Sequence, residues 1–212
     1  MSSLTYGRIQ EYLTSLVPPR EPEMQAMEEY AKQTGFPIIG PAAGYACYQI
    51  ARITAAKAVF EMGSGFGYST AWFAKAVTEN GGGVVHHVVW DAKLSKKATM
   101  HLSRLGYDGI VTYHVGEAVE ALRQASSSFD LIFNDIDKAD YPASLPVIKE
   151  GLRSGGVLII DNILWSGRIF SKTDKSPETE GVRLFTKMIT HDPDWIVSLL
   201  PIRDGLVVAL KK

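Results

Sequence analysis

From about residue 57 onward, short apolar runs alternate with segments of helical periodicity, and this alternation constrains the fold more than any other feature. The runs predicted as strands are 58–62, 84–89, 110–115, 131–134 and 157–160, and the predicted helices between them are 68–77, 94–105, 118–124 and 143–152. Parallel strands need crossover connections, which these helices supply. The pattern predicts an α/β fold with a Rossmann-like, doubly wound, mostly parallel sheet.

The C-terminal part departs from this alternation. A predicted helix over 182–189 is followed by two apolar runs, 195–200 and 206–210, separated by Arg203-Asp204-Gly205. A short polar turn containing glycine between two apolar runs is typical of a hairpin. We therefore expect seven strands in all, with an antiparallel strand at the end. Residues 165–178 are predicted to be irregular, and long loops of this kind are often functional lids.

The first part of the chain, up to about residue 54, has helical character. Ile9, Leu13 and Leu16 recur at helix spacing, and a second, polar helix is predicted over 21–33. A length of 212 residues suits one α/β domain with a full core. We expect a single domain, with a helical cap over 1–54 and an α/β core over 55–212.

Composition and charge indicate which kinds of partner the protein binds and in which cellular compartment it lies. The formal net charge is −1, and no run of Lys or Arg indicates nucleic-acid binding. No apolar stretch approaches the roughly 20 residues that span a bilayer, and residues 1–6 do not resemble a secretory signal. Cys47 stands alone in an apolar helical stretch, where a packed core residue is expected rather than a nucleophile. These features predict a cytoplasmic protein with a small-molecule substrate.

A glycine-rich turn follows the first predicted strand. In Glu61-Met-Gly-Ser-Gly-Phe-Gly-Tyr-Ser, three glycines let the backbone approach a ligand at the carboxyl edge of the sheet. The spacing differs from the dinucleotide fingerprint G-x-G-x-x-G, and a carboxylate at Glu61 is a poor neighbour for a pyrophosphate. The same carboxylate suits the amino and sulfonium groups of S-adenosylmethionine. A nicotinamide-dependent oxidoreductase and tight packing alone are the alternatives.

Acidic and amide side chains follow two later strands. Asp135 and Asp137 come after one apolar run, and Asp161 and Asn162 come after another. Because neighbouring parallel strands end at one edge, these oxygens are expected to converge there. Oxygen ligands without His or Cys suit Mg²⁺, Mn²⁺ or Ca²⁺ rather than zinc. Lys138 is close enough in sequence to face the same point, and helix capping is the alternative role for the Asp and Asn residues.

Together these residues resemble the catechol and caffeoyl-CoA O-methyltransferase family of class I methyltransferases. The similarity runs from about Pro41 to the C-terminus. Its most specific strings are the glycine-rich turn, Phe129-Asp-Leu-Ile-Phe-Asn-Asp-Ile-Asp-Lys, and Gly155-Gly-Val-Leu-Ile-Ile-Asp-Asn-Ile-Leu-Trp-Ser-Gly. Leu200-Pro-Ile-Arg-Asp-Gly-Leu is also similar. The resemblance implies methyl transfer from S-adenosylmethionine to one hydroxyl of a catechol-like molecule, with a divalent cation, usually in a homodimer.

The resemblance also implies roles for particular residues. Asp135, Asp161 and Asn162 are expected to hold the metal, with Lys138 as catalytic base or charge stabiliser beside Asp135. Trp165 is expected to form a wall of the substrate site. The residues expected to bind the methyl donor are Glu61, Gly63, Ser64, Gly65, Tyr68, Ser69, Gly116, Ala118 and Asp135.

The sequence departs from the family pattern at two places. Val89 stands where the family has an acid for the ribose hydroxyls, and Asp91 follows two residues later as its possible replacement. Thr186 stands where relatives carry Asn. The neighbouring pair His86-His87 is interpreted as part of the core or sheet edge. These departures leave a second function class open, a member of the fold that binds a ligand without turnover.

Overall fold

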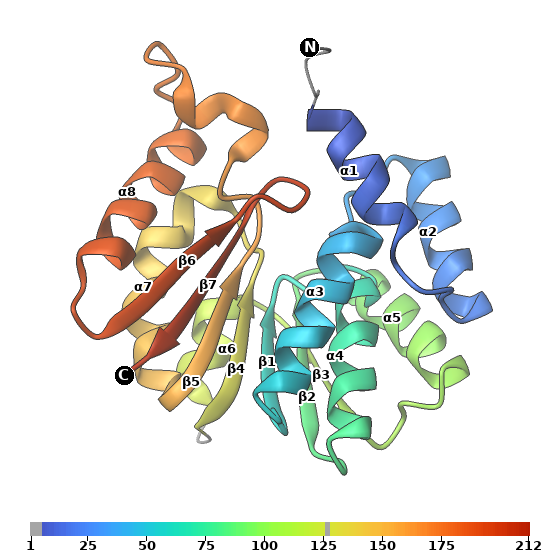
Figure 1. The fold of residues 1–212 in the computed structure, drawn as a ribbon. Helices are drawn as coiled ribbons and strands as arrows, with labels where there is room; N and C mark the ends of the chain where they lie inside the picture. The colour runs from blue at the N-terminus through green and yellow to red at the C-terminus, as the bar shows by residue number, and fades with distance from the viewer. Residues whose placement is uncertain (1–5, 126–127) are drawn as a thin grey trace.

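A seven-stranded sheet forms the centre of the computed structural model, which describes residues 6–125 and 128–212 (Figure 1). The strands are β1 (Ala58–Met62), β2 (Val84–Val89), β3 (Val111–Val115), β4 (Phe129–Asn134), β5 (Leu152–Ile160), β6 (Trp195–Leu200) and β7 (Leu206–Lys211). Their order is β3-β2-β1-β4-β5-β7-β6, and β7 runs antiparallel to both neighbours while the other pairs are parallel. The predicted fold class is confirmed. The first five residues, part of the stretch expected to lack a secretory signal, lie outside the described residues.

Helices cover both faces of the sheet. They are α1 (Tyr6–Ser15), α2 (Pro22–Thr34), α3 (Gly40–Ile53), α4 (Tyr68–Glu79), α5 (Ala92–Arg104), α6 (Ala118–Gln124), α7 (Tyr141–Gly151) and α8 (Pro177–His191). Figure 1 shows α3, α4 and α5 on one side of the sheet and α6, α7 and α8 on the other. The predicted helical cap corresponds to the first three helices. Within the described ranges, no helix is long and apolar enough to cross a membrane.

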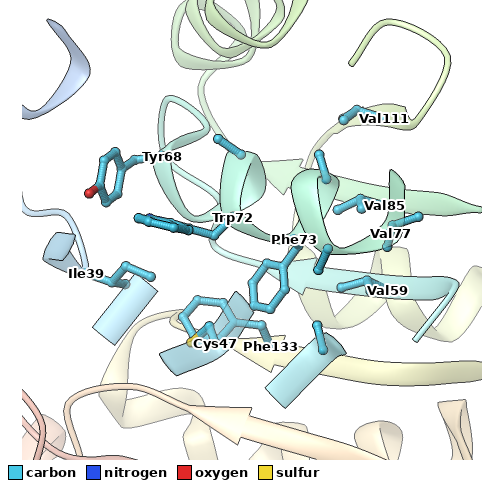
Figure 2. Packing of buried hydrophobic residues seen from close by; sticks show 14 of the residues in the cluster. Ile39, Cys47, Val59, Tyr68, Trp72, Phe73, Val77, Val85, Val111 and Phe133 are labelled. Atoms are coloured by element: carbon cyan, nitrogen blue, oxygen red, sulfur yellow. The ribbon is translucent and has the colours of Figure 1, made fainter. Parts of the chain in front are cut away.

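Each face of the sheet has its own hydrophobic core, because successive strand residues point to opposite faces. Val59 packs with the core beneath α3 and α4, while Phe60 packs with the core beneath α6, α7 and α8. Figure 2 shows the first core, where Phe73 and Phe133 lie beside Cys47. Cys47 is fully buried, and burial raises the pKa of its thiol well above the ordinary value. It is a packed residue, as the sequence indicated.

The segment 165–178 is more regular than predicted. A short 3₁₀ helix, η2 (Trp165–Phe170), occupies its first part, and α8 already begins at Pro177. The earlier start of α8 has a local cause: the Ser176 hydroxyl accepts a hydrogen bond from the Thr179 amide at 3.4 Å, and proline is favoured in the first helical turn. The segment stays irregular at 171–176 and at Ser166 and Gly167, whose dihedral angles are non-helical within η2. The expectation is wrong at its C-terminal end, where the Ser-Pro helix start was not recognised.

Candidate active site

The glycine-rich turn between β1 and α4 packs directly against the loop that follows β4. Gly63, Gly65 and Gly67 all have positive φ, at 86°, 52° and 93°. A Cβ atom on Gly63 would stand 2.5 Å from the carbonyl oxygen of Asp135. Only glycine permits both this conformation and this close approach. The turn therefore brings a backbone suited to ligand binding next to the predicted catalytic loop.

Glu61, at the end of β1, belongs to a buried polar network. Its Oε2 accepts a hydrogen bond from the Thr70 hydroxyl, and Thr70 Oγ1 lies 3.0 Å from His87 Nδ1. Glu61 Oε1 has no hydrogen-bond partner among the residues described. Burial raises the pKa of Glu61 to about 7 and lowers the pKa of His87 to about 3. The sequence analysis missed Thr70 and His87, although a histidine in an otherwise apolar strand is a signal for such a network.

The pKa of Glu61 predicts a pH-dependent stability. It lies above the ordinary value of 4.5, so between pH 4.5 and about 7 the folded chain holds a proton that the unfolded chain releases. The free energy of unfolding therefore falls as pH rises through this window. Glu61→Gln removes this contribution, so we expect it to flatten the fall by up to about 3 kcal/mol. Urea unfolding of variant and wild type at both ends of the window measures this. Glu29→Gln, at an exposed position, is the control, and equal flattening in both variants would contradict the prediction.

The predicted acidic residues lie at the ends of two neighbouring strands. Asp135 follows β4 and Asp161 follows β5, and the last residues of these strands, Asn134 and Ile160, are paired. Lys138 Nζ donates to Asp135 Oδ1 at 2.6 Å. Asp161 is fully buried, and burial, followed by the negative charge of Asp135, raises the pKa of Asp161 to about 7. The sheet thus brings together two carboxylates whose charges repel each other.

The turn between β6 and β7 completes this cluster. Arg203 Nη1 donates to Asp161 Oδ2 at 2.8 Å. Asn162 Nδ2 donates to Asp204 Oδ2 at 3.2 Å, and the Ser166 amide donates to Asp204 Oδ1 at 2.6 Å. The sequence analysis interpreted Arg203 and Asp204 only as turn residues. Their position between two apolar strands gave no sign that they contact residues about 40 positions earlier.

A cavity of about 1220 Å³ opens at this edge of the sheet. The predicted site residues that line it are Gly63, Ser64, Gly65, Tyr68, Ser69, Asp135, Lys138, Asn162 and Trp165. Tyr6, Gln10, Phe36 and Ile38 from the N-terminal part also line it, together with Arg203 and Asp204. Its volume exceeds that of pockets for one drug-sized ligand. The cavity can therefore hold a donor and an acceptor side by side.

Lys138 stands between the acidic edge and an aromatic wall. Its ammonium also donates to the Ile136 carbonyl at 3.1 Å and lies 5.4 Å from the Tyr141 ring centre. The Trp165 ring centre is 5.9 Å away. The side chain of Lys138 is only 11% exposed. A cation held this way can act on a ligand oxygen that reaches the same part of the cavity.

Four predicted donor-site residues, Glu61, Asp91, Gly116 and Ala118, are not among the residues that line this cavity. Asp91 is exposed and accepts a hydrogen bond from the Lys93 amide at 2.7 Å, so it is the N-cap of α5. Gly116 donates its amide to the Val89 carbonyl at 3.0 Å, and Ala118 is buried at the start of α6. Their roles in donor binding stay predictions.

We predict that Asp91→Ala raises the dissociation constant of the methyl donor roughly tenfold, equivalent to about 1.4 kcal/mol, because a carboxylate can accept both ribose hydroxyls. Acceptor binding should change little. Donor titration by calorimetry measures the effect. Ser176→Ala removes another N-cap far along the chain and is the matched control. If donor affinity is the same in both variants, Asp91 serves α5 alone.

The other departures from the family pattern have structural roles here. The Thr186 hydroxyl donates to the Val182 carbonyl within α8 at 2.8 Å, and Thr186 does not line the cavity. His86 stacks on His114 with ring centres 5.1 Å apart, and His87 is fully buried. The interpretation of the histidine pair as part of the core agrees with the structure, whereas the alternative of a sheet edge is wrong, because β2 pairs with β1 on one side and β3 on the other.

The candidate metal ligands at the acidic edge are Asp135, Asp161 and Asn162. Within residues 6–125 and 128–212, no group of three or more His, Cys, Asp or Glu side chains is placed to hold a metal ion. The predicted set contains two carboxylates and one amide, and its chemistry is that of a hard-cation site. Two side-chain cations, Lys138 and Arg203, already gather at these carboxylates. The residue types therefore suit a hard cation, while the two carboxylates are each paired with a side-chain cation in this structure.

A Rossmann-like, mostly parallel seven-stranded sheet with a glycine turn after β1 is the fold of the class I methyltransferases. The chain belongs to the O-methyltransferase family of S-adenosylmethionine-dependent enzymes, because the sequence profile of that family matches residues 23–212. This membership favours a transferase over the nicotinamide-dependent oxidoreductase considered from the sequence.

Individual proteins similar to this chain are also named O-methyltransferases. The chain is 31% identical to a putative O-methyltransferase of Mycolicibacterium vanbaalenii, over 88% of the chain and 82% of the relative. It is 26% identical to a catechol O-methyltransferase of Niastella koreensis over the full length of both. A solved O-methyltransferase from Bacillus cereus, in complex with SAH, has a TM-score of 0.86 and 25% identity, with 96% of this chain and 97% of that chain covered.

Proposed function

We propose that the protein transfers a methyl group from S-adenosylmethionine to one hydroxyl of a catechol-like small molecule, with a divalent cation, Mg²⁺ first among candidates. One observation carries the proposal: Asp135, Lys138, Asn162 and Trp165 line the same cavity as the glycine turn. A donor bound at the turn and an acceptor bound at the cluster would therefore meet. The full-length similarity to a relative named catechol O-methyltransferase supports the choice of acceptor.

The donor would lie against the turn after β1. Gly63 and Gly65 expose backbone there, and Ser69 lines the cavity from the start of α4. Glu61 has a buried oxygen without a partner among the described residues, which suits the amino group of the donor. Holding donor and acceptor in line is the main task of the protein in a direct displacement.

Asp135, Asp161 and Asn162 would hold the cation, which when bound lowers the pKa of a catechol hydroxyl and orients its oxygens. Lys138 lies beside Asp135, where its ammonium can stabilise negative charge on the acceptor oxygen or its amine can take the proton. Trp165 forms an apolar wall 5.9 Å from that ammonium. A flat aromatic acceptor fits between these groups.

A labelled-donor assay with a panel of acceptors tests the proposal. Catechols should be methylated in the presence of Mg²⁺, and phenols with a single hydroxyl should react far more slowly because they cannot chelate a cation. An excess of chelator should stop the reaction. Donor binding without methylation of any acceptor would instead favour the alternative of a member that binds without turnover.

The proposal also covers the oligomeric state, the cellular location and the partners of the protein. We propose a homodimer in the cytoplasm that binds neither nucleic acid nor membrane. The single cysteine and the near-neutral charge support the compartment and the absence of nucleic acid. Light scattering of the purified protein with and without the donor tests the oligomeric state.

A further inference from the structure

The Arg203 guanidinium donates a hydrogen bond to Asp161, a predicted metal ligand. Its Nη1 lies 2.8 Å from Asp161 Oδ2, while Asp161 Oδ1 accepts the Asn162 amide at 2.8 Å. Asp161 has no exposed surface, whereas the Arg203 side chain is 31% exposed and lines the cavity. Both oxygens of this carboxylate are therefore engaged, and the guanidinium lies on the side that faces the cavity.

The backbone of the β6–β7 turn fixes this arrangement. Arg203 has a φ of 52°, which is unusual for a residue with a side chain. Its amide donates to Gln10 Oε1 at 2.6 Å, and its carbonyl accepts the Tyr6 hydroxyl. The Gly205 amide closes the turn on the Ile202 carbonyl at 2.8 Å. Hydrogen bonds to the amide and to the carbonyl of Arg203 thus fix its backbone while its guanidinium contacts Asp161.

Among the described residues, the Arg203 guanidinium is one of two positive groups in a cluster of three carboxylates. Three carboxylates, those of Asp135, Asp161 and Asp204, share the edge with the cations of Lys138 and Arg203. A divalent cation held by Asp135, Asp161 and Asn162 would share the Asp161 carboxylate with Arg203 and would lie near its positive guanidinium. Like charges at such a distance repel each other strongly where solvent is limited.

We propose that Arg203 is a built-in counter-ion that competes with the divalent cation for Asp161, so that metal binding must displace its guanidinium. This inference rests on the metal site of the proposed function. It makes Arg203 a positioning residue that sets the metal affinity of the enzyme. Without a metal, the ion pair keeps the buried carboxylate compensated and the edge of the cavity ordered.

The test is a titration of the full chain with Mn²⁺ in the absence of donor, with free Mn²⁺ followed by electron paramagnetic resonance. Arg203→Gly removes the guanidinium and suits the positive φ, so it should leave the turn intact. Arg203→Met keeps the apolar stem and decides the matter if the glycine variant does not fold. Both should bind Mn²⁺ roughly tenfold or more tightly than wild type, because the competing charge is gone.

Arg168→Met is the matched control. Arg168 is also an arginine near the cavity, with its guanidinium carbon 5.3 Å from the Trp165 ring centre, but it pairs with Asp174 at 2.8 Å. Removing this exposed charge should change Mn²⁺ affinity by less than about twofold. An equal gain in Arg168→Met would mean that overall charge matters and displacement does not, which overturns the inference.

Two further outcomes separate the inference from the proposed function. Equal Mn²⁺ affinity in wild type and both Arg203 variants overturns the role of Arg203 and leaves the metal site in place. No Mn²⁺ binding by any of the proteins overturns the role of Arg203 together with the metal part of the proposed function.

Discussion

Asp135→Ala abolishes methylation of a catechol while the protein stays folded, and Asp161→Ala does the same. Each variant removes one of the two carboxylates proposed to hold the cation. The fold should survive because alanine retains the backbone amides of both residues, which donate to the Met62 and Asn134 carbonyls. The Tyr141 hydroxyl bonds to the backbone carbonyl of Asp161, which alanine retains. Turnover with labelled donor measures the loss of activity. Circular dichroism and thermal unfolding measure whether the fold is retained.

Asp137→Asn is the control for a change of charge in the same loop. Asp137 lies two residues from Asp135, and its carboxylate accepts only the Ala139 amide at 3.4 Å among the described contacts. We expect a much smaller loss of activity for this variant than for Asp135→Asn. Persistent catechol methylation by the wild type in excess chelator would refute the assignment of Asp135 and Asp161 as metal ligands.

Lys138→Ala should lower kcat by about 10²- to 10⁴-fold, the range of general acid–base contributions. The dissociation constant of the donor should stay within about twofold, since the hydrogen-bond partners of the ammonium are Asp135 and the Ile136 carbonyl rather than the glycine turn. Single-turnover kinetics and donor titration separate these two quantities. A loss confined to donor affinity would mean that Lys138 serves the nucleoside side of the cavity.

Two further variants sharpen the test of Lys138. Lys138→Arg keeps the positive charge but cannot accept a proton, because a guanidinium stays charged in proteins. Recovery of activity in this variant assigns Lys138 as charge stabiliser, and no recovery assigns it as base. Lys172→Ala, at an exposed position in the segment before α8, is the control for loss of a lysine outside the cavity lining.

The strands were predictable because their signal is local. β1 and β2 begin and end where the apolar runs do, and buried parallel strands are apolar along their whole length. β5 begins five residues earlier than predicted, at Leu152, because Arg153, Ser154 and Gly155 in its first half are exposed and polar or small. In this part only Leu152 pairs with β4, opposite Phe129, and the register shifts before the next pair, Leu131 with Val157, so both the apolar signal and the regular pairing are interrupted.

The site was predictable only where one motif lay within one turn. The glycine turn and the Asp135–Lys138 loop are short segments, so their internal geometry follows from sequence spacing. Arg203 and Thr70 could not be found in this way, because their partners Asp161 and Glu61 lie 42 and 9 positions away on other elements. Side-chain pairing across a fold depends on register and packing that no local pattern encodes.

The strand order determines when the last strands can join the sheet during translation. In the described sheet, β6 pairs only with β7, and β7 lies between β6 and β5. When β6 emerges during translation, its place at the sheet edge does not yet exist, because the strand that joins it to β5 is still to be made. The turn carrying Arg203 and Asp204 is fixed in the same step. The newly made chain therefore completes the contacts of Arg203 and Asp204 with Asp161 and Asn162 last, after the glycine turn and both acidic strand ends have been synthesised.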